Sequence, residues 1–182
     1  MRIYNRRITE ELSKRIREVL ALDSPIDLKE AVIRLGGELI ENNSLEGDVE
    51  AKIICASEAE KVNFKIIINN QKYSSRKKFK IAHEIGHLFL HMGYLTDFWG
   101  EMNEYTDRDY SKVGFIMEEY EANEFAAAFL MPKDEFKKIA EEKIDEDELG
   151  IEYFYNLNEI AKYFGVSRSA VLTRGMWLGI FG

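Results

Sequence analysis

The sequence His83-Glu84-Ile85-Gly86-His87 constrains the fold of this 182-residue chain more than any other feature. Two residues four positions apart lie on one face of a helix, with their Cβ atoms about 6 Å apart. Two imidazoles placed in this way can bind one metal ion at roughly 2.0–2.1 Å each. Glu84 lies about 100° around such a helix, where its carboxylate can reach water at the ion without binding the ion. The motif therefore predicts a helix that carries a metal site, with Glu84 as the catalytic base.

The flanking residues indicate an amphipathic helix over about 75–92, followed by Gly93. The chain has three histidines, and the third, His91, comes eight residues after His83, about 12 Å farther along a helix. One ion cannot contact both side chains. We therefore expect His91 to support the site from outside the ligand set, near the end of the helix.

The third ligand is expected to be a carboxylate, because no other histidine exists and the single cysteine, Cys55, lies in a predicted strand. A helix predicted over about 117–131 is rich in alanine, which lets it pack closely against another helix. We favour Glu119 as the ligand because it shares a face with Asn123, which can hydrogen-bond a ligating imidazole. Glu121 is the alternative ligand. Two histidines, one carboxylate and one open position are typical of a catalytic site for one Zn²⁺.

Periodicity and turn residues predict the remaining elements. Helices, then short strands with a hairpin, then more helices give an α+β fold with a small antiparallel or mixed sheet packed on a helical core. We expect a metal-binding domain over 1–150 and a helix-turn-helix-like segment over 151–182, which is either separate or part of the same domain. The expected helices cover about 9–21, 27–35, 75–92, 117–131, a stretch after Pro132, 157–164 and 168–178, and the strands 38–41, 49–56 and 62–68.

Composition narrows the functional class. The net charge of −8 makes binding of nucleic acid over the whole surface improbable, although the C-terminal helices keep that possibility open. Those helices carry three basic residues and one acidic residue over 156–182, a weak surplus for binding phosphates. No apolar run approaches the roughly 20 residues that span a bilayer, and the N-terminus lacks the apolar core of a signal peptide. We therefore expect a cytoplasmic protein with no membrane partner.

Three runs of this sequence resemble the ImmA/IrrE metallopeptidases. Residues 79–91 resemble the metal-binding helix of that family, 119–132 its second helix with the closing Leu-Met-Pro, and 160–167 its C-terminal segment. The resemblance implies a zinc-dependent endopeptidase with a gluzincin-like core. It also implies a cytosolic protein substrate, often a transcriptional repressor of a mobile element or stress response.

The same resemblance implies roles for individual residues: His83, His87 and Glu119 as zinc ligands, and Glu84 as the base. Separately, a tyrosine hydroxyl or another polar group is expected to stabilise the oxyanion, and Tyr94, Tyr105 and Tyr110 lie in or beside the long connection over 94–115. Nothing in the sequence selects among these tyrosines. A second hypothesis makes the protein a DNA-binding or protein-binding regulator with a metallopeptidase-like fold and little or no general proteolytic activity.

Overall fold

The computed structural model describes residues 6–42, 50–57, 59–69, 74–101, 104–106, 113–146 and 153–182. The fold is α+β, as predicted. In chain order the described elements are α1 (Arg6–Val19), α2 (Leu28–Arg34), β1 (Gly37–Asn42), β2 (Ala51–Cys55), β3 (Phe64–Asn69), α3 (Ser74–Leu90), β4 (Glu104–Thr106), α4 (Val113–Leu130), α5 (Lys133–Glu142), β5 (Ile144–Glu146), β6 (Tyr153–Tyr155), α6 (Leu157–Phe164) and α7 (Arg168–Trp177).

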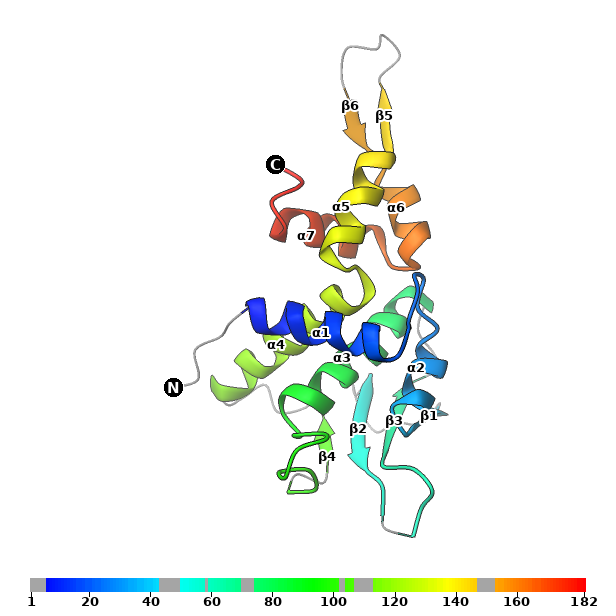
Figure 1. Ribbon diagram of the computed structural model, residues 1–182, viewed down its shortest axis with the longest axis vertical. Helices are drawn as coiled ribbons and strands as arrows, with labels where there is room; N and C mark the ends of the chain where they lie inside the picture. Colours follow the sequence, from blue (N-terminus) through cyan, green and yellow to red (C-terminus); the bar gives the residue numbers. More distant parts are fainter. Residues whose placement is uncertain are drawn as a thin grey trace.

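The larger sheet has the strand order β1-β3-β2-β4 (Figure 1). The predicted hairpin is present, since β2 and β3 pair antiparallel from Ala51 opposite Ile68 to Cys55 opposite Phe64. The sheet is mixed because β1 pairs parallel with β3, whereas β4 pairs antiparallel with β2. Buried side chains alternate along β3, so one of its faces contributes Phe64, Ile66 and Ile68 to the core.

The helix α3 lies between the sheet and α4, and packs against both. Ile81, Ile85 and Leu88 of α3 are buried in the hydrophobic core. On the side of α4 the approach is closer, because a Cβ atom at Gly86 would lie 3.1 Å from the Cα atom of Ala122. The small residues at this crossing therefore allow the two predicted metal-site helices to pack backbone against backbone.

The bounds of the first helix need correction. It was expected over about 9–21, but α1 begins at Arg6 and Thr9 lies buried inside it. Asp27 caps α2 by accepting hydrogen bonds from the backbone amides of Lys29 and Glu30. The side chain of Glu30 pairs with Arg34 one turn later at 2.8 Å.

At the other end of the molecule, α5, α6 and α7 pack together and the β5–β6 hairpin projects beyond them (Figure 1). In the turn between α6 and α7, Gly165 is left-handed at φ 67°, and Ser167 caps α7 through the amide of Ala170. Buried Phe164 and Val171 belong to the same hydrophobic core as the residues of α3. Within the described parts of the chain, no helix combines the length and apolarity that crossing a membrane requires.

Candidate metal centre

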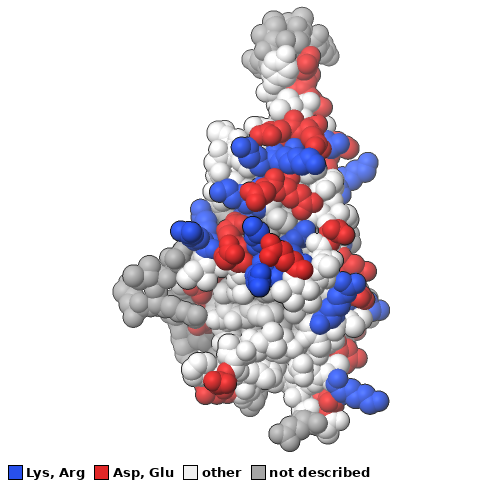
Figure 2. All heavy atoms as spheres, viewed as in Figure 1, with Lys and Arg blue, Asp and Glu red and all other residues white. Residues whose placement is uncertain are grey.

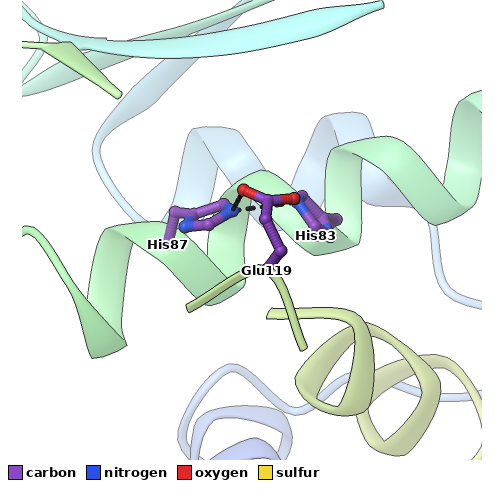
Figure 3. A group of neighbouring side chains, drawn as sticks. All are labelled: His83, His87 and Glu119. Carbon is purple, nitrogen blue, oxygen red and sulfur yellow. Dashed lines mark hydrogen bonds and ion pairs between the residues drawn. The ribbon is translucent and has the colours of Figure 1, made fainter. Parts of the chain in front are cut away.

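The crossing of α3 and α4 brings the three predicted ligands together (Figure 3). The Nε2 atoms of His83 and His87, one turn apart on α3, lie 2.9 Å from each other. Glu119 of α4 points at both rings, with one carboxylate oxygen 3.2 Å from Nε2 of His83 and the other 3.2 Å from Nε2 of His87. The two histidines come from one element and the carboxylate from another, so the site depends on the packing of these two helices.

This donor set fits a tetrahedral metal ion. Ligand atoms that sit 2.0–2.1 Å from a zinc ion at tetrahedral angles are roughly 3.3 Å apart. The separations of 2.9 Å between the two nitrogens and 3.2 Å from each nitrogen to Glu119 come close to that edge length. Imidazole nitrogens suit transition metals such as zinc, iron, copper and nickel, so these donors indicate a transition metal rather than calcium or magnesium.

Burial favours the ligand forms of these side chains. The residues His83 and His87 are 1% and 0% exposed, and the Glu119 side chain is 13% exposed. Burial lowers the pKa of His87 to about 3, despite its hydrogen bond with Glu119, so the imidazole is neutral at pH 7. Burial by itself would raise the pKa of Glu119, but its bonds with the two imidazoles outweigh burial and lower that pKa. Neutral imidazole and ionised carboxylate are the states that bind metal.

Glu84 lies on α3 directly after His83, and its residue exposure is 0%. A carboxylate buried on the same helix as both histidines is in the place that the motif predicts for a proton acceptor. Its role as the base stays a prediction.

The ring nitrogens of the histidines that face away from Glu119 also have partners. Nδ1 of His83 lies 3.0 Å from the side-chain oxygen of Asn123, in line with the interaction expected from the sequence. Nδ1 of His87 lies 2.7 Å from Nδ1 of His91, and Nε2 of His91 lies 3.1 Å from Glu121. The structure therefore does not place Glu121, the alternative third ligand, with the histidine pair. Its carboxylate reaches His91 because that residue lies just beyond the end of α3, on a different side from Glu119.

Of the three tyrosines named as candidate oxyanion donors, the structure describes the side chain of Tyr94 alone. The hydroxyl of Tyr94 donates to the carbonyl of Leu35 and accepts from Asn63 at 3.0 Å, so it holds the connection between α2 and β1. Tyr94 is only 6% exposed and does not serve the metal centre in this arrangement. The backbone of Tyr105 in β4 pairs with Ile53 in β2, but the side chain of Tyr105 lies outside the described part of the chain, as does the whole of Tyr110.

The family model of the IrrE N-terminal-like domain, a peptidase family, matches residues 55–175, which include both helices of this site. The chain belongs to this family. Its resemblance to the ImmA/IrrE metallopeptidases is thereby confirmed, and its fold is metallopeptidase-like. Among solved structures, a Mycobacterium tuberculosis transcriptional regulator shares the fold with a TM-score of 0.62 at 17% sequence identity.

That structural match covers 92% of this chain and 46% of the regulator, so the chain spans less than half of the regulator's length. At this level of identity the likeness concerns the fold alone. A search of curated protein sequences finds no match to the chain.

Proposed function

We propose that this protein is a zinc-dependent endopeptidase that cleaves a cytosolic protein, namely a transcriptional repressor or similar regulator. The observation that carries the proposal is the convergence of His83, His87 and Glu119 within 3.2 Å of one another, with Glu84 buried on the same helix. Three protein ligands and a position left for water distinguish a catalytic zinc site from a structural one, which has four protein ligands. Membership of a peptidase family supports hydrolysis of a peptide bond.

In this proposal His83, His87 and Glu119 would hold the zinc ion. When bound, zinc supplies a Lewis acid that polarises the scissile carbonyl group and lowers the pKa of water beside it. Glu84 accepts the proton of the attacking water and returns it to the nitrogen of the leaving peptide. Because Glu84 is buried, its carboxylate is sheltered from bulk water and keeps a fixed position on α3.

The substrate class rests on the family resemblance, which implies a repressor of a mobile element or stress response. The structural likeness to a protein named as a transcriptional regulator is compatible with a role in gene control. A repressor encoded near this protein's gene is the first substrate to test.

The second hypothesis, a DNA-binding regulator, draws support from the turn between α6 and α7, which joins two helices as in a helix-turn-helix. The charges weigh against it. Arg174, one of the few basic residues of α7, is 2% exposed and bound to Glu10, so it cannot contact phosphate. Figure 2 shows acidic and basic side chains interspersed on one face of the molecule, whereas DNA-binding surfaces gather basic residues.

The proposal is tested by comparing the parent protein with Glu84→Gln and His87→Ala. We expect the parent and Glu84→Gln to contain one equivalent of zinc and His87→Ala to contain little. New protein N-termini, identified by mass spectrometry in cells producing the parent, should be missing from cells producing Glu84→Gln. Identical sets of N-termini would contradict the proposal. A salt-dependent shift of duplex DNA by the zinc-loaded protein, without any cleavage, would instead favour the regulator.

A further inference from the structure

A chain of close contacts runs from α4 to the proposed metal site through two imidazoles. Glu121 of α4 approaches Nε2 of His91 at 3.1 Å, and Nδ1 of His91 approaches Nδ1 of His87 at 2.7 Å. The opposite nitrogen of His87, Nε2, faces Glu119 at 3.2 Å. We propose that Glu121 is a positioning residue, which fixes through His91 the tautomer in which His87 presents its Nε2 lone pair to the metal. This inference rests on the proposed function, because it assumes that His87 is a ligand.

The positions of the protons on His87 and His91 determine which nitrogen donates in each contact. A neutral imidazole carries one proton, on either Nδ1 or Nε2. If Nε2 of His87 binds a metal, the proton is on Nδ1 and is donated to Nδ1 of His91. His91 then carries its own proton on Nε2, where the carboxylate of Glu121 can only accept it. The opposite arrangement would put a proton on Nε2 of His87 and block metal binding, and it would also leave Glu121 facing a nitrogen without a proton.

Burial of the His91 and Glu121 side chains strengthens the contact between them. The side chains of His91 and Glu121 are 1% and 13% exposed, so bulk water is a poor substitute for either partner. A buried N–H group without an acceptor costs about 1–3 kcal/mol, which biases His91 toward the tautomer that Glu121 accepts. A carboxylate oxygen also makes a stronger hydrogen bond with an N–H group than an amide oxygen does.

The two histidines are thus supported differently, but from the same helix. Asn123 accepts from His83 directly, and Glu121 acts on His87 through His91. The helix α4 therefore supplies the proposed ligand Glu119 and also the two hydrogen-bond acceptors, Asn123 and Glu121. Glu121→Gln is the informative substitution, because an amide of the same size can either donate or accept and no longer selects one tautomer.

The experiment uses zinc-loaded protein labelled with ¹⁵N in its three histidines, which two-bond ¹H–¹⁵N correlation spectra can separate. We expect His91 of the parent to carry its proton on Nε2, and His83 and His87 on Nδ1. In Glu121→Gln the His91 signals should shift toward a mixture of tautomers. Zinc affinity, measured by competition with a chromophoric chelator, should fall about 10- to 100-fold. Glu141→Gln, the same change at an exposed position of α5, should leave both measurements unchanged.

Two results would overturn the inference alone: a parent whose His91 carries its proton on Nδ1, or a Glu121→Gln protein that binds zinc as tightly as the parent. The first needs no variant, so it holds even where Glu121→Gln folds poorly. A parent that binds no zinc would overturn the proposed function, and this inference with it.

Discussion

His83 and His87 each direct Nε2 toward Glu119 and contact a second neighbour through Nδ1. An acceptor at Nδ1 keeps the proton on that nitrogen and leaves a lone pair on Nε2, which is the form that binds a metal. It also fixes the rotation of the ring. At the scale of single residues, the geometry of the proposed ligands is therefore set by neighbours that do not touch the ion.

Asn123 provides the simplest test of this idea. Replacing it with alanine removes the oxygen 3.0 Å from Nδ1 of His83, so we expect zinc affinity to fall about 10-fold or more. Asn123→Asp keeps an acceptor at that position and should bind zinc nearly as the parent does. Chelator competition on the three proteins measures the difference. Equal affinity in Asn123→Ala would show that the orientation of His83 does not depend on this contact.

Glu124 predicts a pH dependence of stability. Its residue exposure is 3%, one carboxyl oxygen accepts from Arg6 at 2.7 Å, and the other has no hydrogen-bond partner among the described residues. Burial raises the pKa of Glu124 from 4.5 to about 7, although the charge of Arg174 lowers it in part. The folded state therefore holds this proton more tightly than the unfolded state. Its contribution to stability is largest below pH 4.5 and is lost as the pH rises toward 7.

The Glu124→Gln variant should lack this dependence, because glutamine does not ionise. We expect the stability of the parent relative to the variant to decrease between pH 4.5 and 7, by up to about 1.4 kcal/mol per pH unit. Urea unfolding of both proteins at several pH values gives this difference, which cancels the titration of other groups. A constant difference across the window would contradict the raised pKa.

At the scale of elements, the site depends on how closely α3 approaches α4. A Cβ atom at position 86 would lie 3.1 and 3.2 Å from the Cα and O atoms of Ala122, and 3.2 Å from the ring of Phe125. Backbone atoms cannot move aside without shifting the helix. Because Glu119 comes from α4 and the two histidines from α3, any separation of the helices widens the ligand set.

We therefore expect Gly86→Ala, Gly86→Ser and Gly86→Val to weaken zinc binding, alanine the least and valine the most. Overpacking of this kind costs about 1–3 kcal/mol of stability, which equals or exceeds the roughly 1 kcal/mol that alanine gains over glycine within a helix. Chelator competition and thermal unfolding measure the two effects. A Gly86→Ala protein with unchanged zinc affinity and a higher melting temperature would show that the spacing is not critical.

The sequence predicted the elements whose signals are local. The spacing of His83 and His87 identified α3, and alanines with one suitable glutamate identified α4, because both patterns follow from helix geometry. The short strands β4, β5 and β6 were missed. Each is three residues long, too short for alternation to be recognised. The parallel pairing of β1 with β3 was also beyond sequence patterns, since it joins strands that are not neighbours in the chain.

For the candidate site, the sequence could not predict how α3 and α4 cross. A hydrogen bond from a ligating imidazole to Asn123 was inferred because Asn123 lies one turn from Glu119 on α4, and the structure shows that this imidazole is His83. The contact between Glu121 and His91 was not inferred, because Glu121 lies on a different face of α4 and the angle between α3 and α4 is not encoded in either spacing. The four-residue interval between His87 and His91 was the available signal for a contact between their rings.

At the scale of the whole molecule, Arg174 joins the C-terminal helices to the rest of the protein. Its guanidinium group pairs with Glu10 of α1 through two nitrogens, and its Nε donates to the carbonyl of Met131 at 3.0 Å, just after α4. The Arg174 side chain is 3% exposed and that of Glu10 is 25% exposed. One buried residue of α7 therefore binds both α1 and the residue that follows α4.

Removing this link should destabilise the entire protein. We expect Arg174→Ala to lower the free energy of unfolding by about 3 kcal/mol, because it leaves a partly buried carboxylate and a backbone carbonyl without their donor. Arg15→Ala, which removes an exposed arginine of α1 that pairs with Glu18 at 3.8 Å, should cost less than about 1 kcal/mol.

The two tryptophans allow the ends of the molecule to be followed separately, since Trp99 lies beside Tyr94 and Trp177 lies on α7. Urea unfolding of Trp177→Phe and Trp99→Phe, monitored by the remaining tryptophan, should give coincident transitions if residues 151–182 share one folding unit with the metal site. A transition at Trp177 that precedes the one at Trp99 would instead mark the C-terminal helices as a separate domain.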